Sequence, residues 1–254
     1  MTDLGRGAGD LARGLRYMNQ HKRLWGWVIA PAIVTLVLMV GVVFAVLHLA
    51  APLVDGATSW MPSFLQGIAG ALVSIIVFVA LGFGALLVFV SVVGMIAGPF
   101  NELLSEAIEE QVTGKPGPKF SLGGFFRGAA IGIGHGMRRL AITLVAFVLL
   151  FILGFIPVIG TIAATAIGVW LAARGAAYDC YDAVLSRREL AYRDKQAYLA
   201  ANRKRAMGLG LGVVGMLFVP GVNLLALGLG TAGATLATLE STSAPRGRTS
   251  RRPD

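Results

Sequence analysis

Four long stretches of this chain contain no Asp, Glu, Lys or Arg, and they limit its possible folds more than any other feature. They cover residues 25–54, 56–101, 140–173 and 206–239. A helix of about 20 apolar residues crosses the hydrocarbon core of a bilayer, and a charge at its centre costs roughly 2.5–3.5 kcal/mol on insertion scales. With 56% apolar and 14% charged residues, a soluble domain would lack the polar surface that it needs. The stretches therefore predict an all-α integral membrane protein.

The cationic residues indicate how the chain lies across the membrane. All 22 Lys and Arg residues lie between or outside the four stretches, and the loop 51–63 contains one Asp and no cation. The positive-inside rule then places this loop outside and both termini in the cytoplasm of a multi-pass cell-membrane protein. A net charge of +9 would also suit nucleic acid, but no groove-reading module accompanies it. We expect the lipid bilayer, and not nucleic acid, as a partner.

The first two stretches predict two long transmembrane helices, at about residues 25–50 and 64–98. Residues 1–24 precede them as a short cytoplasmic segment, which we expect to be a helix near the membrane surface. After the second span, a polar helix should continue over residues 101–112. The sequence Gly-Lys-Pro-Gly-Pro at 114–118 should end that helix, because Gly and Pro do not continue a helix there.

The last two stretches each contain 34 uncharged residues, too many for one membrane helix and barely enough for two. Pro157 interrupts the first and Pro220 the second, and proline does not fit inside a continuous helix. We therefore expect two Pro-broken helical hairpins, at about residues 140–173 and 206–239, with both ends of each in the cytoplasm. Their first arms have 17 and 14 residues, or about 25 and 21 Å of helix, against a hydrocarbon core of roughly 30 Å. The hairpins should thus penetrate the membrane only partly.

The two bends are candidates for a transport site. A helix that begins after a bend inside the membrane points its free amide groups and positive dipole end inward, which favours an anion. Short apolar segments interrupted by Pro or Gly in matching positions are the best sequence pointer to such a site. The candidate pore-lining residues are Pro157, Gly160, Pro220 and Asn223. The alternatives are that the tips only pack against each other, and that the Asn223 amide only stabilises its turn.

Several short motifs occur in order along the chain. They are Leu24 with Pro31, Gly98-Pro99-Phe100-Asn101 with Leu104 and Glu106, Ile156-Pro157, Tyr178-Asp179 with Arg187-Arg188, and the glycine-rich stretch 208–215 before Pro220-Gly221-Val222-Asn223. In their order and spacing, from about Gly14 to Leu239, the chain resembles the CysZ sulfate-transporter family and the related etoposide-induced 2.4 family. The resemblance implies two long transmembrane helices, two hemi-penetrating hairpins, a homo-oligomer and sulfate uptake that feeds cysteine synthesis.

The resemblance also points to a site just before the first span. The family's sulfate-binding Gly-Leu-Arg falls there, and this chain has Arg23-Leu24-Trp25 at those positions, so a tryptophan replaces the arginine. Sulfate leaves water only when several donors replace its hydration. The candidate substrate-binding residues are therefore Lys22, Arg23, Leu24 and Trp25. For the two cations, ordinary positive-inside anchoring is the alternative.

Other charged residues are candidates for ion pairs near the membrane surface. Arg138 and Arg139 could pair with Glu106 or Glu109, or line an exit from the pore. Four other residues form an acidic–aromatic helix face that could pair with the following Arg187 and Arg188, and we expect it to hold the fold: Tyr178, Asp179, Tyr181 and Asp182.

The sequence contains no pattern of catalytic or metal-binding residues. The three histidines have no partner at ligand or catalytic spacing, the lone Cys180 is expected to be a small buried residue, and hydrolase, zinc-protease and phosphate-loop motifs are absent. We expect no enzyme, metal or cofactor. One membrane domain over residues 1–239, followed by a basic, disordered tail over 240–254, is predicted to act as a transporter or channel-like permease for a small inorganic anion, with sulfate the leading candidate. The alternative is a non-transporting membrane scaffold that organises lipids or partner proteins.

Overall fold

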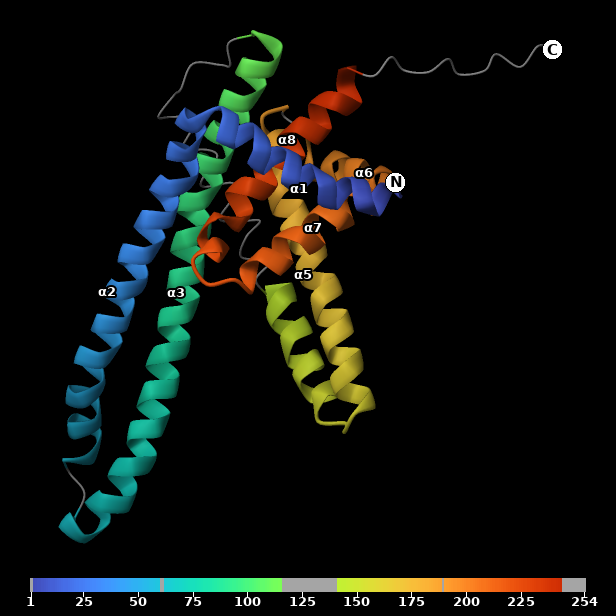
Figure 1. Ribbon diagram of the computed structural model, residues 1–254. Coiled ribbons are helices and arrows are strands. Elements are labelled where there is room, and N and C mark those ends of the chain that lie inside the picture. Colours follow the sequence, from blue (N-terminus) through green and yellow to red (C-terminus); the bar gives the residue numbers. More distant parts are fainter. Residues whose placement is uncertain (1, 60–61, 116–140, 189, 244–254) are drawn as a thin grey trace, which may run out of the picture. The chain divides into compact units, whose positions relative to one another are not determined.

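The computed structural model describes residues 2–59, 62–115, 141–188 and 190–243. Every regular element in these ranges is a helix, which confirms the predicted all-α class (Figure 1). Among the described residues, three helical segments are long and apolar enough to cross a membrane: Lys22–Thr58, Ile159–Ser186 and Val222–Thr242. The chain divides into a larger unit, made of Met1–Ile29 and Gly98–Asp254, and a smaller unit, Ala30–Ala97.

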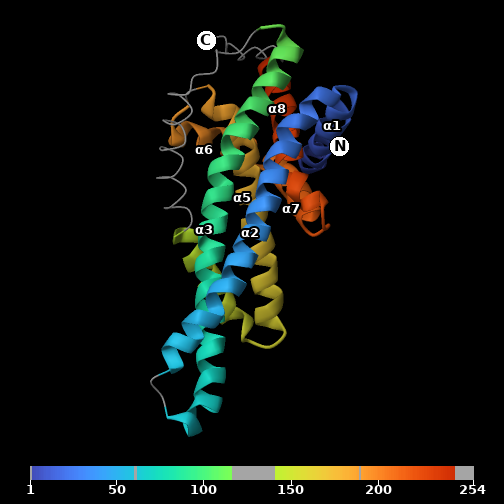
Figure 2. The ribbon, with the colours of Figure 1, turned by 90° about the vertical axis from the view of Figure 1, so that its left-hand side faces the viewer.

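The smaller unit is a pair of long helices. It contains most of α2 (Trp25–Thr58) and the first part of α3 (Ser63–Thr113), which lie side by side (Figure 2). Many of its bulky apolar side chains are exposed; Phe44, for example, is 70% and Ile76 65% accessible. A helix pair with such a surface is suited to contact lipid tails.

α2 extends further than the sequence predicted. It runs through Pro52 to Thr58, so most of the expected outer loop 51–63 is helical. Proline removes only one backbone hydrogen bond from a helix. The last carbonyls of α2 also have partners, because the Thr58 hydroxyl donates to Val54 and the Ser59 amide to Asp55, both at 2.9 Å.

α3 ends where the sequence predicted. It continues through Pro99 as one helix to Thr113. Gly114 follows with a φ of 68°, and its N–H donates to the Glu110 carbonyl at 2.8 Å. A left-handed glycine directly after the last turn is a common helix end. The first glycine of Gly-Lys-Pro-Gly-Pro therefore ends this helix.

The larger unit is built around α8 (Ala226–Ser243). Three helices pack against it: α1 (Asp3–Gln20), α5 (Ile159–Ser186) and α7 (Arg203–Leu217). Figure 1 shows α1 lying across α7 and α8. Most of α8 is buried, with Ala226, Thr231 and Ala234 fully covered. The helix predicted within residues 1–24 is thus present, and one side of it is covered by protein.

Glycines allow these helices to approach closely. A Cβ at Gly208 of α7 would overlap the Leu4 carbonyl of α1. A Cβ at Gly14 of α1 would lie 2.6 Å from the Gly233 nitrogen of α8. Small residues at such crossings let helix backbones pack directly against each other, so α1 is held tightly against α7 and α8.

An ion-pair network fastens α1 to the same two helices. The Asp10 carboxylate, which is only 2% exposed, accepts hydrogen bonds from Arg205 Nε and Nη2 at 2.6 and 2.8 Å. Glu240 accepts from Arg205 at 2.7 Å and from Arg13 at 2.8 Å. Bidentate pairs of this kind are among the stronger polar contacts in proteins. Hydrogen bonding to Asp10 accordingly raises the pKa of Arg205 above its ordinary value.

The end of α8 corrects a predicted boundary. The helix runs to Ser243, so residues 240–243, which were expected in the disordered tail, are helical. Glu240 is held by the ion-pair network, and the hydroxyls of Ser241 and Thr242 donate to the Thr238 carbonyl at 2.8 and 2.9 Å. These bonds stabilise the last turn. Residues 244–254 of the predicted tail lie outside the described residues.

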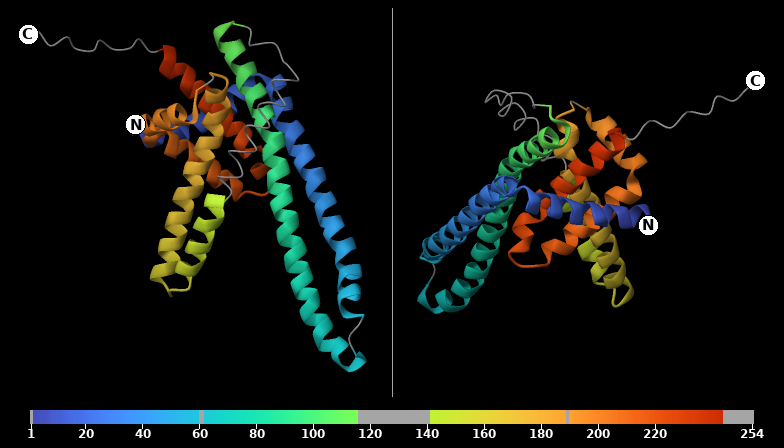
Figure 3. Two further views of the ribbon diagram at one scale, coloured as in Figure 1. Left: turned by 180° about the vertical axis from the view of Figure 1, so that it is seen from behind. Right: turned by 45° about the horizontal axis from the view of Figure 1, so that its top comes forward.

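Two hairpins bend at the predicted prolines. In the first, a helix over Ala141–Gly154 and α5 lie side by side and join through a turn that contains Pro157 (Figure 3). In the second, α7 and α8 join through a turn that contains Pro220 and Gly221, followed by the short helix η2 (Val222–Leu225). Gly221 has a φ of 82°, a conformation that glycine adopts without strain.

The first hairpin has a longer second arm than the predicted range 140–173. α5 continues to Ser186, and its last part lies in the core of the larger unit with Leu209 and Val213 of α7. Packing therefore continues the helix after the charge-free stretch ends at Arg174. The short helix α6 (Tyr192–Ala201) follows and contacts α5 and α7.

Candidate functional site

The four predicted substrate-binding residues form the junction between α1 and α2. After α1, the 3-10 turn η1 (Lys22–Leu24) leads directly into α2 at Trp25. His21 closes α1, because its N–H donates to the Tyr17 and Met18 carbonyls, both at 3.1 Å, and its ring packs on the Tyr17 ring. The chain therefore passes from one helix to the next within a few ordered residues.

Leu24 anchors this junction in the protein core. Its side chain is 1% exposed and belongs to an apolar cluster with six other buried residues: Met18 of α1, Val28 of α2, Leu104 and Ile108 of α3, and Leu229 and Ala232 of α8. Trp25 and Trp27 pack against the same cluster. Trp25, at the position where the resemblance implies an arginine, thus contributes apolar packing. The cluster holds the turn in a fixed position.

Lys22 and Arg23 are exposed at this turn. Their N–H groups are the first two of η1, where helix geometry supplies no acceptor. Among the described residues, neither side chain forms an ion pair. The junction therefore offers two cationic side chains and two amides on a fixed turn. Charge-assisted hydrogen bonds from such a group of donors suit an oxyanion.

The hairpin bends present mostly apolar surface. Pro157 and Pro220 are exposed, and their neighbours Phe155 and Phe218 are 73% and 78% accessible. Side chains of this kind are suited to lipid contact and offer no donor to an anion. A pore-lining role for the two prolines stays a prediction.

Gly160 and Asn223, the other two candidates at the bends, have different surroundings. Gly160 is buried within its own hairpin, where a Cβ would overlap the Leu153 carbonyl, so this glycine permits close packing of the two arms. Asn223 is exposed, and its N–H donates to the Val219 carbonyl at 3.0 Å within the turn. A pore-lining role for the Asn223 side chain also stays a prediction.

Glu109 pairs with the two arginines that directly follow α5. Arg187 Nη1 lies 3.1 Å from Glu109 Oε2, and Arg188 Nη2 lies 4.0 Å from Oε1. Glu106 lies half-buried one turn earlier on α3. The predicted partners Arg138 and Arg139 lie outside the described residues, so their pairing with either glutamate stays a prediction.

The acidic–aromatic face of α5 packs into the fold, but its partners differ from the prediction. Tyr181 is buried, and Asp182 Oδ1 accepts a hydrogen bond from Lys195 Nζ of α6 at 2.8 Å. Because α5 stays helical to Ser186, Asp182 and Arg187 are five residues apart and lie on different faces. The predicted pairing of this face with Arg187 is therefore wrong for Asp182.

The Asp10 network is the main feature that the sequence analysis missed. Arg13 and Glu240 are 227 positions apart, so no local pattern relates them. A partial signal was present, since Gly7, Asp10 and Gly14 are three and four residues apart and fall on one face of a helix. A single acid among glycines on one face predicts a buried, paired carboxylate at a close helix crossing.

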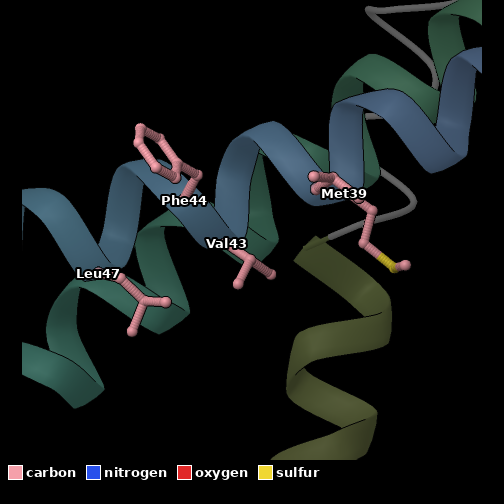
Figure 4. Close-up of a pocket in the computed structure, with 5 residues that line it drawn as sticks. Met39, Val43, Phe44 and Leu47 are labelled. Carbon is pink, nitrogen blue, oxygen red and sulfur yellow. The ribbon is translucent and has the colours of Figure 1, made fainter.

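An apolar pocket in the smaller unit does not suit an anion. It is lined by five residues of α2: Met39, Val40, Val43, Phe44 and Leu47 (Figure 4). None of these side chains can replace the hydration of a charged ion. Within the part of the chain that the structure describes, no group of His, Cys, Asp or Glu is arranged to hold a metal either.

Comparison with known proteins assigns this arrangement to a family. Residues 10–227 match the family described as sulfate transporter CysZ/etoposide-induced protein 2.4. The chain belongs to this family. The CysZ match begins at Asp10 and contains the α1–α2 junction and both proline bends. It ends at Leu227, so most of α8, the central helix of the larger unit, lies beyond it.

Three relatives illustrate the similarity. A protein named sulfate transporter CysZ from Pseudomonas fluorescens (strain Pf0-1) is 31% identical over 214 residues, which cover 83% of this chain and 84% of that protein. A protein of the same name from Pseudomonas aeruginosa (strain LESB58) is 32% identical over 188 residues, or 72% of this chain and 73% of the relative. One from Salmonella typhimurium (strain LT2) is 27% identical over 210 residues, or 82% of each chain.

Proposed function

We propose that this chain is a membrane transporter or channel-like permease that takes up sulfate. The observation that carries the proposal is the alignment with proteins named sulfate transporter CysZ over four-fifths of both chains. The α1–α2 junction supports it, because cations and free amides are the groups that a doubly charged oxyanion requires. The apolar surfaces of the hairpins and the smaller unit agree with a membrane location.

Lys22 and Arg23 are the residues that we propose to meet sulfate first. Both are exposed, and both belong to the turn that Leu24 fixes in the core. Their side chains supply charge, and their backbone amides supply fixed donors. The Trp25 side chain supplies neither, so in this chain the cations before it take the place of the family's arginine.

For the topology, we infer cytoplasmic termini and hairpins that penetrate the membrane only partly. The distribution of the cations supports the orientation, since the smaller unit, Ala30–Ala97, contains no Lys or Arg. α7 has 15 residues, or about 22 Å of helix, which is shorter than a hydrocarbon core of roughly 30 Å. A homo-oligomer is the assembly that the family resemblance implies.

Uptake of labelled sulfate into proteoliposomes tests the proposal. We expect saturable uptake above that of empty vesicles, and a loss of at least about tenfold at low sulfate in Lys22→Ala/Arg23→Ala, because two charge-assisted contacts are removed. Arg203→Ala/Lys204→Ala is the matched control, since it removes two exposed cations from the start of α7. The control should retain wild-type uptake.

The outcomes separate the competing functions. Wild-type vesicles that take up no more sulfate than empty ones would reject transport and favour the membrane scaffold. Normal uptake by Lys22→Ala/Arg23→Ala would keep transport and reject the junction as its binding site. Equal losses in both double variants would mean that only the net charge of the cytoplasmic face matters.

A further inference from the structure

A second cationic group lies beside the apolar cluster, at the end of α5. Arg187 follows the last residue of this helix, and its side chain is only 14% exposed. Its Nη1 lies 3.1 Å from Glu109 Oε2 and donates to Ser105 Oγ at 3.3 Å. Its Nε is buried and has no hydrogen-bond partner in the described chain. A buried guanidinium N–H without an acceptor is costly, so this donor is available to an acceptor atom.

Arg187 and Arg188 share one acidic partner among the described residues. Arg188 approaches the same carboxylate, with Nη2 4.0 Å from Glu109 Oε1, so two guanidinium groups share one glutamate. Arg188 Nη1 donates further to the Thr242 hydroxyl at 3.3 Å. The neighbouring Asp182 does not balance the second arginine, because it is already paired with Lys195 at 2.8 Å.

Glu102 is a further acid near Arg187. It lies on α3 about one turn before Ser105 and forms no ion pair with a described residue. Among the described residues, Glu109 is therefore the acid that pairs directly with Arg187 and would compete with an anion for it.

Arg187 and the α1–α2 junction contact the same part of α3. Leu104 and Ile108 pack in the cluster that holds Leu24, whereas Ser105 and Glu109 contact Arg187. Consecutive helix residues are about 100° apart, so these two pairs lie on adjacent faces of one turn.

We propose that Arg187, together with Ser105 and Arg188, forms a second oxyanion-binding site, which an ion reaches after the Lys22–Arg23 junction. The inference rests on the proposed function, because it makes the site part of the sulfate route. A tetrahedral oxyanion has several acceptor oxygens, which match the guanidinium fork, the orphan Nε–H and the Ser105 hydroxyl. Glu109 pairs with Arg187 when no ion is bound, and the bound ion replaces the Glu109 carboxylate.

Two substitutions with opposite expected effects test the site. Arg187→Gln removes the donors and should raise the KM for sulfate uptake by about tenfold or more. Glu109→Gln removes the competing carboxylate and should lower the KM. The matched control is Arg193→Gln, an exposed arginine on α6, which should leave the KM unchanged.

A second measurement excludes a purely structural role for Arg187. Sulfate that binds the folded protein raises its thermal midpoint in detergent. This increment should shrink in Arg187→Gln and grow in Glu109→Gln, even if both variants start from a lower midpoint. Equal increments in all variants, with unchanged KM values, would overturn the proposal and leave Arg187 as a structural link. Failure of wild-type uptake would instead reject the proposed function, which is a different result.

Discussion

The hairpin at Pro157 and the hairpin at Pro220 have the same plan, yet one is exposed and the other is buried. Each comes from a charge-free stretch of 34 residues with a proline in its interior. In the first, Phe147, Phe151 and Ile162 are all at least 60% exposed. In the second, most of α8 is covered by the surrounding helices.

Side-chain size explains this difference better than hydrophobicity. The first hairpin has bulky Phe, Ile and Leu residues at its bend and in its first arm, whereas the second has glycines wherever helices cross. Gly208 and Gly233 let α1 approach the second hairpin at backbone distance. A Cβ at Gly154 of the first hairpin would have no atom of another segment within 4 Å. The second hairpin is therefore suited to form the core of the unit, and the first is suited to face lipid.

The largest expected effect is on the ion pair that ties the second hairpin to α1. Asp10→Ala leaves Arg205 without its buried partner, and breaking such a pair typically costs about 3–5 kcal/mol in the free energy of unfolding. Denaturant unfolding in detergent, followed by helical circular dichroism, measures this loss. Asp3→Ala is the control, because its pair with Arg6 is exposed and should contribute less than about 1 kcal/mol. Equal losses in both variants would contradict the importance of the network.

Truncation of one apolar side chain in each hairpin compares their burial directly. Leu209→Ala in the second hairpin creates a cavity at a fully buried site and should cost about 2–4 kcal/mol. Ile159→Ala in the first should change stability in detergent by no more than about 0.5 kcal/mol, because this side chain is 77% exposed. A large loss from Ile159→Ala would show that the first hairpin is covered after all.

Addition of one methyl group tests the close helix crossings. Gly208→Ala should cost about 1–3 kcal/mol, since its Cβ would overlap the Leu4 carbonyl and force α1 away. Gly154→Ala should cause no loss, because a Cβ there meets no other segment. Thermal midpoints of the two variants in the same detergent provide the comparison. If both tolerate alanine equally, glycine does not explain the different burial of the hairpins.

The smallest expected effect concerns pH at the base of the first hairpin. Burial raises the pKa of Glu102 above its usual value of 4.5, and Asp182 adds to this, while Lys195 and Arg187 oppose it. The folded protein therefore holds this proton more tightly than the unfolded chain, so stability falls as the pH rises through the folded pKa. Glu102→Gln should show a flatter pH profile and slightly higher stability at neutral pH. A wild-type pH profile in this variant would rule out Glu102 as the source of the pH dependence of stability.

The sequence was sufficient to predict the helical membrane class, the bends at Pro157 and Pro220, and the helix end at Gly114. Each of these depends on local chemistry, such as the missing proline N–H or the left-handed conformation of glycine. It also grouped Lys22 with Arg23, because neighbours in sequence at a short turn stay neighbours in space. The family resemblance supplied sulfate, which no residue pattern alone indicates.

What the sequence did not provide depends on contacts between distant segments. Asp10 and Arg205 are 195 positions apart, and their pairing follows from how α1 crosses α7. The same is true of Arg187, whose partner Glu109 comes from α3. Residues 51–58 of the predicted loop and residues 240–243 of the predicted tail are helical. Neighbouring hydroxyl groups and ion pairs stabilise these helix ends, which composition alone marks as irregular.

Labelling of single cysteines tests most directly whether both bends end inside the membrane. In a Cys180→Ala background, Val158→Cys and Val222→Cys place one thiol at each bend, and Ser59→Cys places one at the end of α2. A membrane-impermeant maleimide added to intact cells should modify Ser59→Cys and neither bend. Modification of both bends at the rate of Ser59→Cys would mean that each hairpin crosses the whole bilayer, and the proposed topology would be wrong.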